Sequence, residues 1–291
     1  MAGDKHRLAV LPLVNISPDP GDEYFADGMT EELISALSNV GGLSVIARTS
    51  AMKYKGATKS VAEIGRDLNI KTLLEGSVRK AGNKVRITVQ LIDAQSEEHL
   101  WAQAYDRDLE DIFAIQSDIA QRVARSLRVQ IVRREKRAIE QRATDVVEAY
   151  TLYLKGRHEW NKRSPEGLDL AVHHFGQALE KDASYALAYS GLADAYALQA
   201  LYEFAPPREV FPKAKAAAER ALQLKTGARG LRTIIEEVLL EVMYEIPSRA
   251  DVRKCIIGRE TIAHGQAPLL VTTRSGAIAE LEEASEYRDA S

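Results

Sequence analysis

The stretch KTLLEGSVRKAGNKVRITVQLIDAQSEEHLWAQAYDRD, residues 71–108, decides the fold of the first part of this chain. It contains three strand-like runs, and in the middle run apolar and polar residues alternate from Val85 to Leu91. Such alternation is typical of a strand with one buried and one wet face. Glycine and asparagine at 82–83 indicate a first turn, and residues 93–98 a second. We therefore expect three consecutive strands joined by turns.

The residues before this stretch predict a strand followed by a helix, twice over. Residues 7–15 form an apolar run that indicates a buried strand, and residues 22–39 carry apolar side chains at helical spacing. Residues 43–50 indicate a second strand, and residues 60–70 a short helix. Ser60 precedes that helix with a glutamate three residues later, which is the pattern of a capping box.

One long helix is expected after the three strands, from about Leu109 to Gln141. The order β-α-β-α-β-β-β then predicts an α+β domain over residues 6–141, with a mixed sheet that carries helices on one face. The long helix becomes basic toward its end. An anion or nucleic-acid contact is one interpretation of that run. A solvated face is the other, because cations are favoured near a helix C-terminus. The basic residues are Arg122, Arg125, Arg128, Arg133, Arg134, Lys136 and Arg137.

Residues 145–225 predict an all-helical region built from two helix pairs. Small and large residues recur at packing positions, as in Ala171, Phe175 and Ala178. Large residues on one helix fitting over small ones on the next are typical of the tetratricopeptide repeat. The matching alanines 171 and 214 are 43 residues apart, whereas the standard repeat has about 34. The extra residues fall in a proline-containing loop before the last helix.

Composition restricts the classes of function. The formal net charge of −3 gives no general reason to expect nucleic acid or an anionic membrane as partner. The single cysteine, Cys255, excludes a disulfide framework and a cysteine-rich metal site. The first residues lack the long apolar core of a signal peptide, and no run reaches about 18 apolar residues. A cytoplasmic location is therefore expected.

The α+β and helical segments together resemble a known arrangement of domains. LAVLPLVNISPDPGDEYFADGMTEELISAL, VIARTSAMKYKG and the stretch from EGSVRKAGNKVRITVQ onward resemble the TolB N-terminal-like domain. In bacterial proteins this domain commonly lies between an effector domain and tetratricopeptide repeats. The effectors are adenylate cyclases, kinases or CadC-type DNA-binding domains. The segment GRHEWNKRSPEGLDLAVHHFGQALEKDASYALAYSGLADAYAL resembles the repeats. The resemblance covers about residues 6–225, and no effector domain is expected before it.

The remaining residues resemble a different family. Residues 226–262 are similar to the C-terminal part of ClpX, the ATP-driven unfoldase, in which GAR-x-LR opens the sensor-2 helix. The resemblance implies that Arg229 is the arginine that contacts ATP, and that residues 268–271 form the last strand of a small α/β subdomain over 226–271. Residues 272–291 are polar and acidic, and disorder is expected there. The chain contains no G-x-x-x-x-G-K-[ST] phosphate loop, so neither nucleotide nor any other cofactor is expected.

No group of residues predicts catalysis. His173 and His174 are adjacent, and adjacent helical residues point about 100° apart rather than forming an i, i+4 zinc pair. The acidic run at 106–111 is explained by a turn and a helix N-terminus, where carboxylates offset the helix dipole. No catalytic residue and no metal ligand are therefore predicted.

The sequence thus predicts a non-catalytic signalling scaffold that binds a protein partner through the groove of its repeats, without membrane or nucleic acid. A fragment or partner of a Clp ATPase is the first alternative. The regulatory part of an adenylate cyclase or a transcriptional regulator is the second. Two repeats fall short of the usual three, so neighbouring segments are expected to pack on them. The candidate partner-binding residues are Tyr153, Trp160, Tyr189 and Tyr196; each has core packing as its alternative role.

Overall fold

The structure is a computed structural model that describes residues 5–224, 252–256 and 269–272. These residues divide into two compact units. Unit 1 comprises residues 5–162 and 180–183, and unit 2 comprises residues 163–179 and the described residues from 184 onward.

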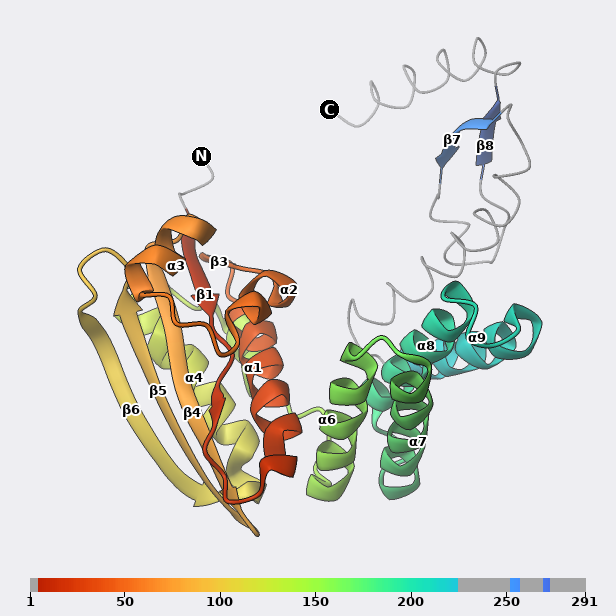
Figure 1. Ribbon diagram of the computed structural model, residues 1–291, viewed down its shortest axis with the longest axis horizontal. Helices are drawn as coiled ribbons and strands as arrows, with labels where there is room; N and C mark the ends of the chain where they lie inside the picture. Colours follow the sequence, from red (N-terminus) through yellow and green to blue (C-terminus); the bar gives the residue numbers. More distant parts are fainter. Residues whose placement is uncertain (1–4, 225–251, 257–268, 273–291) are drawn as a thin grey trace. The chain divides into compact units, whose positions relative to one another are not determined.

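Unit 1 is an α+β domain around a mixed six-stranded sheet with the order β3-β1-β4-β5-β6, and with β2 beside β4. Figure 1 shows β4, β5 and β6 running side by side, with α4 behind them. The strands are β1 (His6–Val10), β2 (Val14–Asn15), β3 (Leu43–Val45), β4 (Thr72–Ala81), β5 (Lys84–Asp93) and β6 (His99–Asp108). The helices of three or more turns are α1 (Glu23–Ser38), α4 (Ile112–Ser126) and α6 (Val147–Asn161). The shorter ones are α2 (Arg48–Ala51), α3 (Val61–Leu68) and α5 (Arg133–Glu140), with single turns η1 (Pro20–Asp22), η2 (Met52–Tyr54) and η3 (Leu109–Asp111).

The three strands expected from residues 71–108 are confirmed. β4 pairs with β5 and β5 with β6, both antiparallel, through ten and nine residue pairs. The turn at 82–83 needs a left-handed residue, and Gly82 supplies it with a φ of +58°. The capping box is confirmed as well, because the Glu63 carboxylate accepts a hydrogen bond from the Ser60 backbone N–H at 2.8 Å.

The expectation that all helices cover one face of the sheet is wrong. β1 pairs in parallel with β3 on one side and with β4 on the other. The connections through α1 and through α3 therefore cross the sheet in opposite directions, and right-handed crossovers then place these two helices on opposite faces. Ile64 of α3 packs with Ala9 and Leu73. Leu8 is fully buried and points to the other face, because successive side chains alternate along a strand.

Two predicted elements are shorter than expected. The strand predicted over 7–15 stops at Val10 and resumes for only two residues, because Pro12 in between has no N–H to donate to a neighbouring strand. The strand predicted over 43–50 ends at Val45, and α2 begins at Arg48. Arg48 is within 3.5 Å of the Glu31 carboxylate, so this turn of helix directs its side chain toward α1.

The long helix predicted from Leu109 to Gln141 is wrong, because it is two helices. α4 ends at Ser126, and Arg128 adopts a left-handed conformation with a φ of +56°. The Val129 N–H then donates to the Ala124 carbonyl, which closes the helix end. Residues 129–132 contain three β-branched side chains and favour helix poorly. The chain resumes as α5, which packs back against α4: the Ser117 hydroxyl donates to the Ile139 carbonyl at 2.8 Å.

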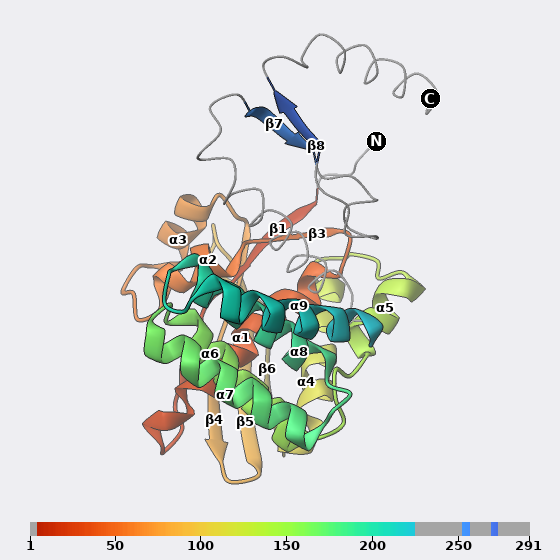
Figure 2. The same ribbon diagram turned by 90° about the vertical axis from the view of Figure 1, so that its right-hand side faces the viewer.

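In the part of unit 2 that the structure describes, helices pack through small residues, and one pair of strands is present. Residues 165–179 of α7 belong to unit 2. The Phe175 ring of α7 lies so close to Gly191 of α8 that a Cβ there would come within 2.6 Å of it. α8 and α9 lie side by side (Figure 2), and Ala193 clusters with Ala217 and Ala218 between them. The elements are α7 (Pro165–Lys181), α8 (Ala186–Leu201), α9 (Pro207–Gln223), β7 (Val252–Ile256) and β8 (Leu269–Thr272).

β7 and β8 pair antiparallel, and β8 lies where a strand was predicted at 268–271. The predicted sensor-2 helix and the tail over 272–291 lie mostly outside the described residues. None of the described helices has the length and apolar character needed to cross a bilayer.

Candidate interaction sites

A buried polar cluster joins α6 to α1 within unit 1. Asp27 and Glu31 stand one turn apart on α1, and each residue is less than a tenth exposed. Arg157 of α6 donates from Nη2 to Glu31 Oε1 at 2.5 Å, and His158 Nδ1 lies 3.1 Å from Asp27 Oδ2. Lys55 Nζ contacts Asp27 Oδ1 at 2.5 Å. We call these five residues the α1–α6 cluster.

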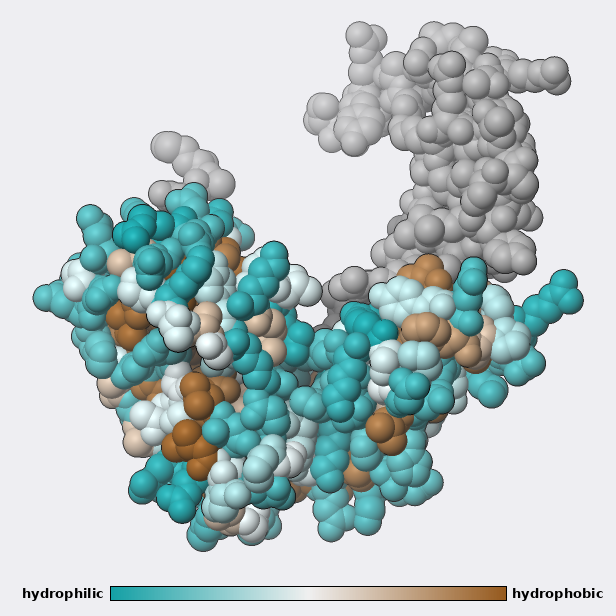
Figure 3. Space-filling view, viewed as in Figure 1, coloured by the Kyte–Doolittle hydropathy of each residue, from teal (hydrophilic) through white to brown (hydrophobic). Residues whose placement is uncertain are grey.

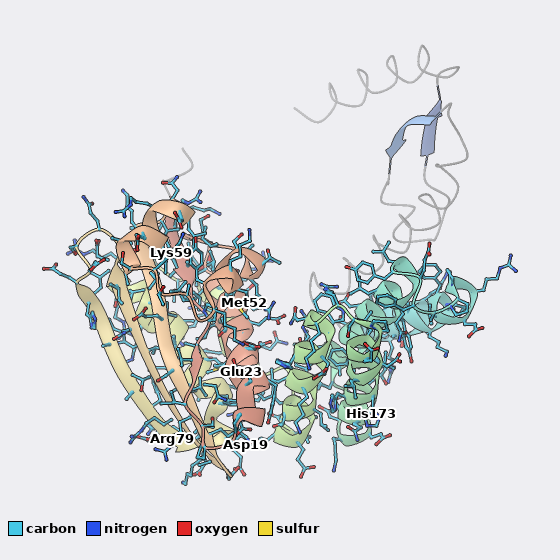
Figure 4. All side chains as sticks on the ribbon, viewed as in Figure 1. Asp19, Glu23, Met52, Lys59, Arg79 and His173 are labelled. Carbon is cyan, nitrogen blue, oxygen red and sulfur yellow. The ribbon has the colours of Figure 1, made fainter. Side chains whose placement is uncertain are left out.

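The α1–α6 cluster is extended by three further residues at its edges. Lys55 also pairs with Glu23, which Figure 4 labels at the start of α1. Arg48 donates from Nη1 to the Asn161 side chain at 3.1 Å, and its Nε lies 3.5 Å from Glu31. Glu31 is thus approached by two guanidinium groups, a geometry that compensates a carboxylate removed from water.

The electrostatics of Asp27 follow from this arrangement. Burial by itself raises the pKa of the Asp27 carboxyl group, but hydrogen bonds from His158 and Lys55 outweigh it and hold the pKa below its usual value. Asp27 is therefore ionised at neutral pH. The cluster is an ion-pair network, and it positions α6 on the domain.

Apolar contacts hold α6 at the same interface. Gly28 of α1 faces Leu154 of α6, and a Cβ on Gly28 would lie 2.7 Å from the leucine side chain. Tyr150 is fully buried, and its hydroxyl oxygen accepts a hydrogen bond from Gln116 of α4 at 2.7 Å. Burial, with the nearby charge of Glu32, raises the pKa of Tyr150 well above its usual value. α6 is thus part of the α+β unit, although the sequence prediction placed it with the repeats.

The structure separates the four predicted partner-binding residues into two groups. Tyr153 and Trp160 are on α6 in unit 1. Tyr153 is buried, and the Arg157 guanidinium lies 4.3 Å from the Trp160 ring centroid. Tyr189 and Tyr196 are on α8 in unit 2 and are only partly buried. Arg229, the predicted nucleotide contact, lies outside the described residues.

An exposed apolar tip, formed by the last residue of α8 and the loop that follows it, was not predicted from the sequence. Leu201, Tyr202 and Phe204 are 48%, 41% and 40% exposed, and the two rings are 5.6 Å apart. Figure 3 shows a mainly hydrophilic surface with separate brown areas, one of them over the α8–α9 region. The signal in the sequence was the surplus length of this loop, which was interpreted only as a break between helices.

A hollow of about 900 Å³ lies within unit 1 beside the start of α6. Its walls mix apolar side chains such as Phe113 and Leu152 with charges of both signs. Two of those charges, Lys181 and Glu148, pair with each other at 2.9 Å. Among the described residues no group of His, Cys, Asp and Glu side chains is arranged to hold a metal ion. On α7, His173 (Figure 4) lies with its ring 5.7 Å from that of His174.

Residues 4–125 match a regulator family. The family model is described as the second domain of HilA/YgeH-like transcriptional regulators, and the match covers the α+β domain up to α4. The sequence predicted a domain of bacterial regulators for this region, and that part of the prediction is confirmed.

Among the curated proteins that match, one resembles a long part of the chain and another resembles a short part. It is 42% identical over 192 residues to "Putative adenylate cyclase 3" of Rhizobium meliloti, a match that covers 65% of this chain and 32% of that protein. It is 47% identical over 58 residues to an ATP-dependent Clp protease ATP-binding subunit, ClpX 3, of Methylococcus capsulatus, covering 20% of this chain and 13% of the subunit. The chain thus spans about a third of the cyclase relative's length, and less of the ClpX relative's.

Solved structures add little. TolB from Acinetobacter baumannii aligns over 43% of this chain and 28% of its own, with 13% identity and a TM-score of 0.33. A score at this level carries no inference about the present chain.

Proposed function

We propose that this chain is a non-catalytic regulatory module whose helical region, α7–α9, belongs to the tetratricopeptide class and binds a protein partner. The regulator family model supports the regulatory role of the α+β domain. The similarity to a putative adenylate cyclase is confined to 32% of that protein. The shared part is, in this proposal, the part that regulates rather than the part that catalyses.

The observation that carries the partner-binding role is the two-sided character of α8. Its alanines 188, 193, 195 and 197 are buried, which lets the neighbouring helices approach closely. Tyr189 and Tyr196 stand seven residues apart and therefore on one face, where both are partly exposed. The Lys213 ammonium of α9 lies 5.8 Å from the centroid of the Tyr196 ring. Partly exposed aromatic rings on a rigid helix are typical of the residues that dominate binding energy at interfaces.

Site-specific photo-crosslinking tests this role. A benzoylphenylalanine is placed at position 189, at position 196, or at the exposed His173 of α7 as a control, and the full chain is irradiated in its native cells. We expect a discrete cross-linked protein from positions 189 and 196 and none from position 173. That protein, purified, should bind the Tyr189→Ala, Tyr196→Ala double variant at least tenfold more weakly than the wild type. Equal cross-linking at all three positions, or unchanged affinity, contradicts the proposal.

A part in an ATP-dependent Clp assembly is the second candidate, because of the 58-residue similarity to a ClpX subunit. It predicts that the full chain binds ATP and that Arg229→Ala abolishes the binding. The regulatory proposal predicts no binding in a calorimetric titration with millimolar Mg·ATP. Micromolar affinity that depends on Arg229 would favour the Clp role.

A further inference from the structure

Positive charge is concentrated in unit 1 at the end of α4 and along α5. Residues 121–142 contain eight arginines and lysines and two glutamates, in a chain whose net charge is −3. One continuous helix would have spread these cations over about six turns. The break after α4 instead folds α5 back beside α4 and gathers them on one part of the domain.

α5 is held in place from its inner side. Glu135 accepts hydrogen bonds from the backbone N–H of Gly41 at 3.0 Å and of Val132 at 3.1 Å. Ile139 is buried, and its carbonyl is bound by Ser117 of α4. The inner side of α5 is therefore fixed to two other elements, which leaves its outer side as a rigid surface.

The outer side carries cations without counter-ions. Arg133 and Arg137 stand one turn apart on the same face of α5, and both are exposed. Arg125 and Arg128, at the end of α4, are exposed as well. Within the described part of the chain, none of these four guanidinium groups is paired with a carboxylate.

A small hollow of mixed polarity opens beside Arg125. It has a volume of about 220 Å³, and its walls are the aliphatic side chains of Val129 and Ile131 and the polar side chains of Gln121, Arg125 and Lys136. Val132, next along the chain, is 57% exposed. A hollow of this size accepts one aliphatic side chain, and the surrounding charge selects against a basic one.

We propose that this surface, formed by Arg125, Val129, Ile131, Arg133, Lys136 and Arg137, binds an acidic amphipathic segment of a protein partner. One apolar side chain of the segment occupies the hollow, and neighbouring carboxylates pair with the arginines, whose planar forks suit bidentate contacts. Charge complementarity favours this occupant, and so do the two aliphatic side chains in the wall of the hollow. Single-stranded nucleic acid fits less well, because no aromatic side chain lines the surface for bases to stack on. A lipid surface fits less well too, because only Ile131 and Val132 are available for insertion.

Fluorescence anisotropy of the full chain tests the proposal. The probe is a fluorescein-labelled peptide of sequence DELLEEIDEL, titrated at 50 and 300 mM salt. Binding at low salt should weaken at least tenfold in an Arg125→Gln, Arg133→Gln, Arg137→Gln triple variant. An Arg107→Gln, Arg208→Gln, Lys215→Gln triple variant removes three exposed cations elsewhere and should change the affinity less than twofold. Ile131→Ser should weaken binding severalfold at both salt concentrations, because its contribution is apolar.

Three results overturn the proposal. The first is a peptide affinity that is the same in the two triple variants, because the arginines of α4 and α5 would then form only a solvated face. The second is tighter binding of a 20-base-pair DNA duplex than of the peptide, lost in the same arginine variant. The third is tighter binding of vesicles that contain anionic phosphatidylglycerol than of the peptide, again lost in the arginine variant. Circular dichroism of each variant confirms the fold, and single Arg133→Gln and Arg137→Gln variants replace the triple variant if it unfolds.

Discussion

Arg157 of α6 and Glu31 of α1 lie 126 residues apart in the chain and 2.5 Å apart in the structure. Both side chains are largely buried, with 14% and 9% of their surface exposed. The pair therefore attaches α6, the last helix before unit 2, to the first helix of the α+β domain.

Removal of this pair should destabilise unit 1 strongly. Arg157→Ala removes the cation that lies 2.5 Å from the buried Glu31 carboxylate, and breaking a buried ion pair costs about 3 kcal/mol. Urea unfolding of the full chain, followed by circular dichroism, measures the loss. The matched control is Arg142→Ala, which removes the exposed pair with Asp145 and should cost less than about 0.5 kcal/mol. Equal losses in the two variants would contradict a buried role for Arg157.

The pH dependence of stability should reveal Asp27. Because its folded-state pKa lies below the usual 3.8, the ionised carboxylate contributes stability above that pH, and the contribution is lost as the pH falls through the folded-state pKa. Asp27→Asn should therefore be less stable than the wild type at pH 7, with the difference shrinking below about pH 4. Denaturation midpoints between pH 7 and pH 2.5 test this. A difference that stays constant over the whole range would rule out the assigned role.

Two glycines in unit 2 make a matched pair. Gly191 faces the Phe175 ring, so alanine there must displace a buried aromatic side chain, whereas alanine at Gly176 meets no atom within 4 Å. Both substitutions gain about 1 kcal/mol of helix propensity, but overpacking costs about 1–3 kcal/mol. We expect Gly176→Ala to raise the thermal midpoint and Gly191→Ala to lower it. A rise in both would show that the α7–α8 contact is loose.

The capping box of α3 should contribute measurably to the free energy of unfolding. Ser60→Ala removes the side-chain acceptor of the Glu63 N–H and should cost about 1 kcal/mol. Ser60→Asp keeps an acceptor and should restore most of the loss in the same urea titration. If the alanine variant is as stable as the wild type, α3 is stabilised by its packing alone and not by the capping box.

Local patterns predicted the elements in which a single physical rule dominates. The alternation from Val85 to Leu91 gave β5, and the Ser60 pattern gave the start of α3, because both rules act over a few residues. The break in the predicted long helix was missed because it depends on the left-handed Arg128 and on packing of α5 against α4. The position of α3 on the second face was missed because strand order is a tertiary property.

The α1–α6 cluster could not be predicted from the sequence for a similar reason. Its members are spread from Asp27 to His158, and each is an ordinary ionisable residue in its own segment. Only the folded chain brings the carboxylates of α1 to the cations of α6. The packing role of Tyr153, by contrast, had been weighed from the sequence, because an aromatic residue in a helix with small neighbours often fills a core.

The order of strands has a consequence for synthesis on the ribosome. β1 is made first, yet it lies between β3 and β4, and Leu8, Ala9 and Val10 are all fully buried in the finished domain. One edge of β1 must therefore stay unpaired until residues 72–81 have left the exit tunnel. During that interval the nascent chain presents an apolar strand to its surroundings, which makes this the stage at which chaperone binding or misassembly would act.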